Sequence, residues 1–186
     1  MIRCRRSHER GALKRTLQCT VLAASPVFAL ALAASAATAP LPQEPAAGTG
    51  LAVTGEDGKA QRFDEAALSA LPQRTVRAEA HGKAVECRGP DLIDVLAKVG
   101  APTGEGLRGK NLALYVRASA ADGYRVVFAL AELDRGMREE VPIITASCNG
   151  KPLDAKDGPF RLIVPGEKRP ARWIRQITAI DLLRAP

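Results

Sequence analysis

Short apolar runs separated by glycine, proline and aspartate turns recur along residues 51–186, and they limit this part of the chain to a fold of short strands. The strongest single signal is Asn149-Gly150, because a type I′ hairpin turn needs positive φ at both central residues. The expected strands cover residues 51–54, 60–63, 74–80, 84–87, 112–118, 124–130, 141–148, 160–164 and 173–183.

Two helices are expected between these strands. Asp64 is placed to cap a short helix over residues 65–71, which Pro72 ends. The second helix follows Asp91, where apolar side chains repeat at helical spacing until Gly100. The sequence therefore predicts an α+β class, a mixed, mostly β domain with two short helices.

The first 36 residues have the three-part layout of a secretory signal peptide. Met1–Arg15 is basic, Leu17–Leu32 is apolar, and small residues follow. Cleavage is expected before Ala37, because Ala34-Ser35-Ala36 fits the small-x-small rule. We therefore expect a periplasmic or secreted protein, with membrane attachment only if the signal is not cleaved. Residues 37–50 hold three prolines and two glycines and are expected to form a flexible leader before a single domain over 51–186.

The charge of the domain excludes one class of partner. Six of the 27 Lys and Arg residues and one of the 20 Asp and Glu residues lie in the first 36 positions, so residues 37–186 carry a net charge of only +2. A nucleic-acid partner is not expected, because it would need basic charge concentrated on the folded domain. His81 is the only histidine of the domain, so the sequence offers no multi-histidine metal site, and we assign no metal ligand and no catalytic residue.

The domain has two cysteines, Cys87 and Cys148. Export would place them in an oxidising compartment, where they could form one disulfide. Free cysteines are also often small buried residues, and the sequence leaves both alternatives open.

A basic segment near the C-terminus is the most suggestive local feature. Four cations, Lys168, Arg169, Arg172 and Arg175, lie within eight residues, and Glu167 precedes them. They could hold phosphate or another anion through charge-assisted hydrogen bonds. The alternative is a solvated turn that Trp173 anchors to the core.

Several motifs together resemble the oxidoreductase molybdopterin-binding domain, the family with the sulfite-oxidase-like fold. The resemblance covers residues 51–183 and implies that fold, with molybdopterin as a possible cofactor. It also implies that the basic segment lies near the pterin phosphate, with Arg172 and Arg175 as the first candidates. The motifs are Gly89-Pro90-Asp91-Leu92 and the residues up to Leu96, Asp122-Gly123-Tyr124 with Ala131-Glu132-Leu133, Asn149-Gly150-Lys151-Pro152-Leu153, Gly158–Gly166, and Arg172–Ile177.

One position departs from the family pattern. The resemblance implies a molybdenum-binding cysteine near the end of the strand at Arg74–Ala80, where this chain has Ala78-Glu79-Ala80-His81. Two hypotheses follow. The chain is a non-catalytic, cofactor-free binding module for a small anion or for a protein partner such as a periplasmic redox or sensor protein. Alternatively, it is a molybdopterin-dependent periplasmic oxidoreductase or a component of one.

Overall fold

The computed structural model of the protein describes residues 50–80 and 82–186. The expected signal peptide at 1–36, nearly all of the expected leader at 37–50, and His81 lie outside the described residues. Within the described residues, no helix is long and apolar enough to cross a membrane.

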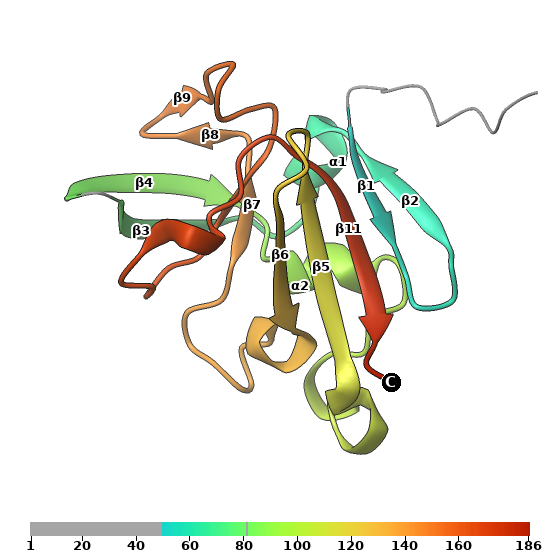
Figure 1. The fold of residues 1–186 in the computed structure, drawn as a ribbon. Coiled ribbons are helices and arrows are strands. Elements are labelled where there is room, and N and C mark those ends of the chain that lie inside the picture. Colours follow the sequence, from blue (N-terminus) through green and yellow to red (C-terminus); the bar gives the residue numbers. More distant parts are fainter. Residues whose placement is uncertain (1–49, 81) are drawn as a thin grey trace, which may run out of the picture. The chain divides into compact units, whose positions relative to one another are not determined.

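The largest sheet has five strands in the order β2-β1-β11-β5-β6 (Figure 1). Only β1 and β11 pair in parallel, and every other pair in this sheet is antiparallel. Along β5 the side chains alternate between buried and half-buried, which is the period-two pattern of a strand with one face on the core. The bounds are β1 Leu51–Thr54, β2 Ala60–Phe63, β5 Leu114–Ala120, β6 Arg125–Ala129 and β11 Ile177–Arg184.

A second sheet has four strands in the order β3-β4-β8-β9, and β7 and β10 form a separate antiparallel pair. The predicted hairpin at Asn149-Gly150 is confirmed, since it joins β8 to β9 with φ angles of 52° and 71°. The bounds are β3 Arg74–Ala80, β4 Lys83–Gly89, β7 Ile143–Thr145, β8 Ser147–Cys148, β9 Lys151–Pro152 and β10 Arg161–Ile163.

Cys87 and Cys148 form a disulfide in the structure. They face each other directly in the register of β4 against β8, and Cys87 is buried in the core. The bond closes a sequence separation of 61 residues and fastens the short β8–β9 hairpin to β4. Of the two alternatives that the sequence left open, the structure has the disulfide.

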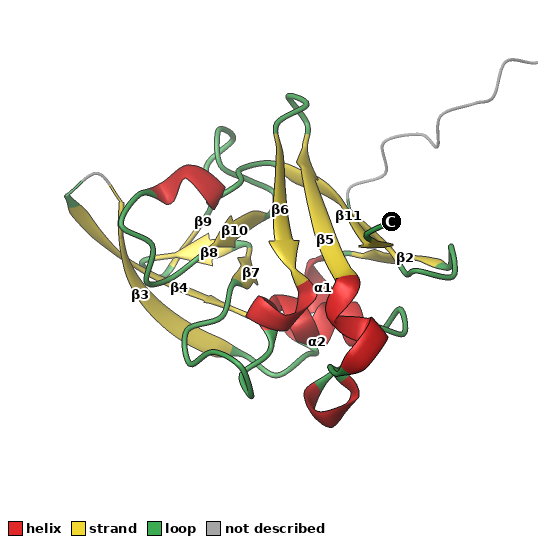
Figure 2. Ribbon diagram, turned by 60° about the horizontal axis from the view of Figure 1, so that its bottom comes forward, coloured by secondary structure: helices red, strands yellow, loops and turns green. Residues whose placement is uncertain are grey.

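Both expected helices are present, so the mixed, mostly β prediction is confirmed (Figure 2). Helix α1, Glu65–Ser69, is capped by Asp64, whose Oδ1 accepts a 2.7 Å hydrogen bond from the Ala67 amide. Helix α2, Leu92–Ala97, buries four apolar side chains in the same core cluster as the strands. Four short 3-10 turns complete the described elements, at Gly104–Gly106, Gly109–Ala113, Leu130–Leu133 and Pro170–Arg172.

The strand expected from residue 173 was wrong in its first four positions, because β11 begins only at Ile177. Long-range contacts hold Trp173 and Ile174 instead. The Trp173 indole Nε1 donates to the Val164 carbonyl at 2.8 Å, and the Ile174 carbonyl accepts from the Leu162 amide at 2.9 Å. These bonds hold Trp173 and Ile174 next to β10, so the chain joins the five-stranded sheet only from Ile177.

A buried carboxylate joins three parts of the chain. Asp91, only 2% exposed at the start of α2, accepts a 2.7 Å hydrogen bond from Arg74 Nε on β3 and pairs with Arg135. Arg74 also donates to the Val141 carbonyl. Because a buried charge is tolerated only when it is paired, these contacts fix β3 and the 135–141 segment to the start of α2.

Replacing this carboxylate tests its structural role. We expect Asp91→Asn to lower the free energy of unfolding by about 3 kcal/mol, because it leaves Arg74 without its buried counter-charge. The matched control is Glu86→Gln, which removes a carboxylate from the exposed pair with Arg77 and should change stability little. Urea unfolding of both variants measures the difference, and equal midpoints for the two variants would contradict the assignment.

Candidate functional site

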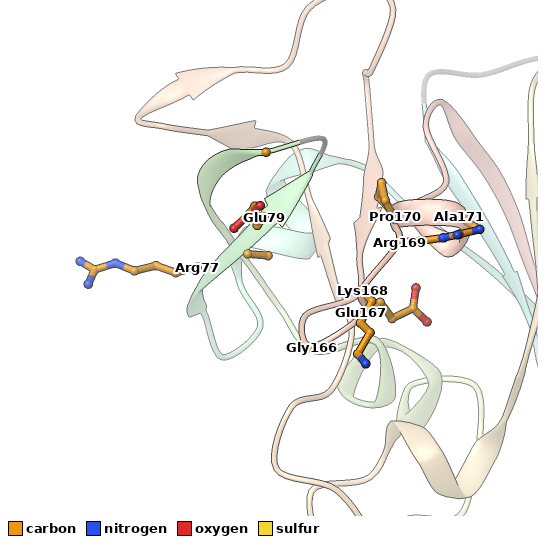
Figure 3. A pocket seen from close by; sticks show the side chains of 10 residues that line it. Arg77, Glu79, Gly166, Glu167, Lys168, Arg169, Pro170 and Ala171 are labelled. Atoms are coloured by element: carbon orange, nitrogen blue, oxygen red, sulfur yellow. The ribbon is translucent and has the colours of Figure 1, made fainter.

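The described residues form one large cleft, with a volume of about 920 Å³ (Figure 3). One wall is the end of β3 with the turn that follows it, and the other is the loop after β10. The lining residues are Arg77, Ala78, Glu79, Gly82 and Gly166–Ala171. The β3 wall is the segment where the family resemblance places a metal ligand, and the loop belongs to the basic segment. The structure therefore brings these two predicted regions together.

The loop wall takes its shape from its two ends. Gly166 has a φ of +77°, in the left-handed region that favours glycine, and it turns the chain away from buried Pro165. Pro170 begins the 3-10 turn that closes the loop, since a proline suits the first turn of a helix. Trp173 follows this turn and is buried, which anchors the loop to the core.

Arg172 holds this loop to the rest of the domain. Its guanidinium donates to Glu167 at 2.6 Å and to Glu132 at 3.0 Å, and it lies 4.5 Å from the centre of the Phe128 ring. Burial by itself lowers the pKa of Arg172, but the hydrogen bonds to Glu132 and Glu167 outweigh that effect and the pKa is raised. Arg172 is therefore a charged group already neutralised by two carboxylates.

The structure separates the four predicted cations. Lys168 and Arg169 line the cleft, and neither makes an ion pair or a side-chain hydrogen bond with any described residue. Arg172 does not line the cleft and is held by its carboxylates. Arg175 lines a different, smaller pocket. Only two of the four candidates thus line the large cleft, and their proposed contact with a pterin phosphate stays a prediction.

The β3 wall contributes less charge than its residues suggest. Arg77 points away from the loop, as Figure 3 shows, and pairs with Glu86 on β4 at 2.8 Å. Glu79 lines the cleft and has no ion-pair partner among the described residues. After these pairings, the groups left for a ligand are Lys168, Arg169 and Glu79.

The donor set suits an anion better than a thiolate-bound metal. Two unpaired cations fit a phosphate or carboxylate group. The described part of the chain supplies no free thiolate, because Cys87 and Cys148 are bonded to each other. It also contains no group of three or more His, Cys, Asp and Glu side chains that could hold a metal ion. These residues do not fit a molybdenum ion held by a protein cysteine.

A solved structure has a similar fold. The crystal structure of the sulfane dehydrogenase SoxCD from Paracoccus pantotrophus matches with a TM-score of 0.56 at 19% sequence identity. The match covers 72% of this chain and 38% of that chain, so the present chain spans well under half of its structural neighbour. No curated protein sequence matches the chain.

A family model then identifies the chain directly. The model of the oxidoreductase molybdopterin binding domain matches residues 38–185. The chain belongs to this family, and its sulfite-oxidase-like fold agrees with the resemblance found in the sequence.

Sequence reasoning missed the acidic partners of the basic segment. Glu132 lies 40 positions before Arg172, so no local pattern could show that the two side chains pair. Glu167 lies five residues before Arg172, and this spacing is a local signal for the pair. Lys156, which shares a pocket with Arg175, carried no signal in the sequence.

The different positions of Arg172 and Arg175 predict different effects of the same substitution. We expect Arg172→Ala to lower the free energy of unfolding by about 2 kcal/mol, because it leaves the partly buried Glu167 without its counter-charge and leaves Glu132 with Arg138 alone. Hydrogen exchange of the 166–171 amides should also become faster. Arg175→Ala is the matched control, since Arg175 is exposed and unpaired among the described residues, and it should leave urea unfolding unchanged. Similar unfolding midpoints for both variants would refute the structural role of Arg172.

Proposed function

We propose that this protein is a non-catalytic binding module that holds a small anion in the cleft between β3 and the 166–171 loop. The observation that carries the proposal is that Lys168 and Arg169 line this cleft without an ion-pair partner among the described residues. A family fold does not fix function, and here the residues that line the cleft favour binding over redox chemistry.

The charge balance of the cleft supports an anionic ligand. Among its lining residues, Glu167 is neutralised by Arg172 and Arg77 by Glu86. The lining residues that remain charged are Lys168 and Arg169 against Glu79, and the carboxylate of Glu140 lies beside Gly166 at the edge of the cleft. The cleft is as large as typical small-molecule sites, so it has room for an organic anion as well as an inorganic ion.

We also propose that the module acts in the periplasm or outside the cell. The basic, apolar and small-residue layout of residues 1–36 supports export. The Cys87–Cys148 disulfide supports an oxidising compartment, because structural disulfides are rare in a reducing cytosol.

The second candidate function is a molybdopterin-dependent oxidoreductase, or a component of one. Membership of the oxidoreductase molybdopterin-binding family is the observation that favours it. The phosphate of such a cofactor could use Lys168 and Arg169, so the two functions share an anion site and differ in the metal.

Metal analysis separates these two functions. We expect protein purified from its native compartment to hold molybdenum below about a tenth of an equivalent, and to show no pterin fluorescence after oxidation, because the described chain offers no free thiolate. A stoichiometric amount of molybdenum would establish the second candidate instead.

Removing the two cleft cations tests the anion site. We expect Lys168→Gln/Arg169→Gln to weaken binding of a nucleoside monophosphate at least tenfold, since each charge-assisted hydrogen bond to a phosphate contributes about 1.5 kcal/mol or more. The NMR amide signals of Gly82 and Gly166, which lie on opposite walls of the cleft, report binding. Lys98→Gln/Arg108→Gln is the charge-matched control, because both side chains are exposed and neither lines the cleft.

Addition of the nucleotide should shift both glycine signals in the wild-type protein and in the control variant. The dissociation constants of the two proteins should be the same. A nucleotide that leaves the glycine signals unmoved in the wild-type protein, or that binds the Lys168→Gln/Arg169→Gln variant equally well, would reject this site for anionic ligands of that kind.

A further inference from the structure

The domain has a second pocket, which takes no part in the proposed function. Its volume is about 240 Å³, and it forms where the β5–β6 turn, the 154–157 turn and the segment 173–176 meet. It shares no lining residue with the large cleft. Its polar and aromatic lining residues are Asp122, Tyr124, Lys156, Trp173, Arg175 and Gln176.

The charges of this pocket are unequal. Lys156 and Arg175 both line it, and neither makes an ion pair or a side-chain hydrogen bond with a described residue. Asp122 is the one acidic residue of the lining, and its Oδ1 is occupied by the Tyr124 amide at 2.9 Å. The neighbouring Asp157 pairs with Arg161 and so neutralises neither lining cation. One positive charge therefore remains in excess.

Hydrogen bonds within the protein hold the walls of the pocket in place. Gln176 has a φ of +47°, in the left-handed region that a non-glycine residue keeps only where its neighbours enforce it. Its amide donates to the Asp157 carbonyl at 3.0 Å, and its side-chain Nε2 donates to the Ala155 carbonyl at 2.8 Å. Its carbonyl accepts from the Ala121 amide at 3.0 Å. Gln176 thus joins all three walls.

The backbone that carries the lysine is also held. Asp154 Oδ1 accepts hydrogen bonds from the amides of Lys156 at 2.9 Å and Asp157 at 3.0 Å. An aspartate that binds amides two and three residues ahead defines a tight turn. The two cations therefore project from segments whose backbone positions are set before any ligand arrives, which lowers the entropic cost of binding.

We propose that this pocket is a second anion site, which binds a small tetrahedral oxyanion of the sulfate or phosphate class between Lys156 and Arg175. The guanidinium of Arg175 offers a planar pair of donors that matches two oxygens of such an anion, and Lys156 adds a compact charge. The volume equals that of about eight water molecules, so the oxyanion can be free or can be the head of a small ester. The inference is independent of the proposed function, because it uses different cations.

A tryptophan that lines this pocket can report binding through its fluorescence. Trp173 is the only tryptophan of the sequence, and it lines the second pocket but not the large cleft. We expect sulfate or phosphate, titrated at constant ionic strength against sodium chloride, to change the tryptophan fluorescence saturably. The NMR signals of the Trp173 indole and the Gln176 side-chain amide should follow the same binding curve.

The variants separate the two sites. Lys156→Gln/Arg175→Gln should weaken the fluorescence-detected binding at least tenfold, while Lys168→Gln/Arg169→Gln should leave it unchanged. If the first double variant failed to fold by circular dichroism, the single variant Lys156→Gln, at an exposed turn residue, would replace it. Loss of nucleotide binding at Gly82 and Gly166 with sulfate binding retained would count only against the proposed function.

The source of the oxyanion is decided by a third titration with methyl phosphate. Binding of inorganic phosphate and methyl phosphate alike would indicate a site for free ions as well as esters, and binding of methyl phosphate alone would indicate an ester site. A fluorescence change no larger than that of sodium chloride for all three ligands would overturn the proposal. Binding that Lys156→Gln/Arg175→Gln leaves intact would overturn it as well.

Discussion

The contact of Arg172 with two carboxylates and an aromatic ring is the interaction on which both candidate sites depend. Arg172 joins the loop after β10 to Glu132 and, through the Phe128 ring, to β6. The residues before Arg172 line the large cleft, and the residues after it line the second pocket. Because Arg172 and Trp173 are both fixed, they divide one basic segment between two surfaces of the domain.

This division changes the chemistry of the basic segment. Four cations close in sequence suggest one strong anion site, but in the structure one of them is neutralised and the others face separate cavities. Among its lining residues, each cavity is then left with two unpaired cations and one carboxylate, so the ligands that we propose are small anions of low charge. Each site also gains a cation or a wall from a distant segment, such as Lys156 in the second pocket.

The parts of the fold that the sequence could predict are those set by local chemistry. Asp64 caps α1 through a bond three residues ahead, and Asn149-Gly150 makes its turn from its own backbone preferences. The strands at residues 74–80 and 84–87 and the helix after Asp91 follow from similar short patterns, whereas the fold class of the family followed from the resemblance of several motifs together. The start of β11 was missed because Trp173 and Ile174 are held by residues of the β10 segment, and no local signal opposes a strand there. For the same reason the sequence could name the candidate cations but could not show which of them were already paired.

The cysteines show how a family fold can stand without a thiolate in its cleft. In the described chain both are used to join β4 to the β8–β9 hairpin, so that their sulfur atoms add stability instead of a metal ligand. On the neighbouring strand, β3 presents Ala78 and Glu79 to the cleft, and neither side chain can supply a sulfur donor. On the opposite wall Lys168 and Arg169 have no ion-pair partner among the described residues, which is why we propose an anion as the ligand. The specificity that we propose for the cleft therefore rests on charge and not on a bond between sulfur and a metal.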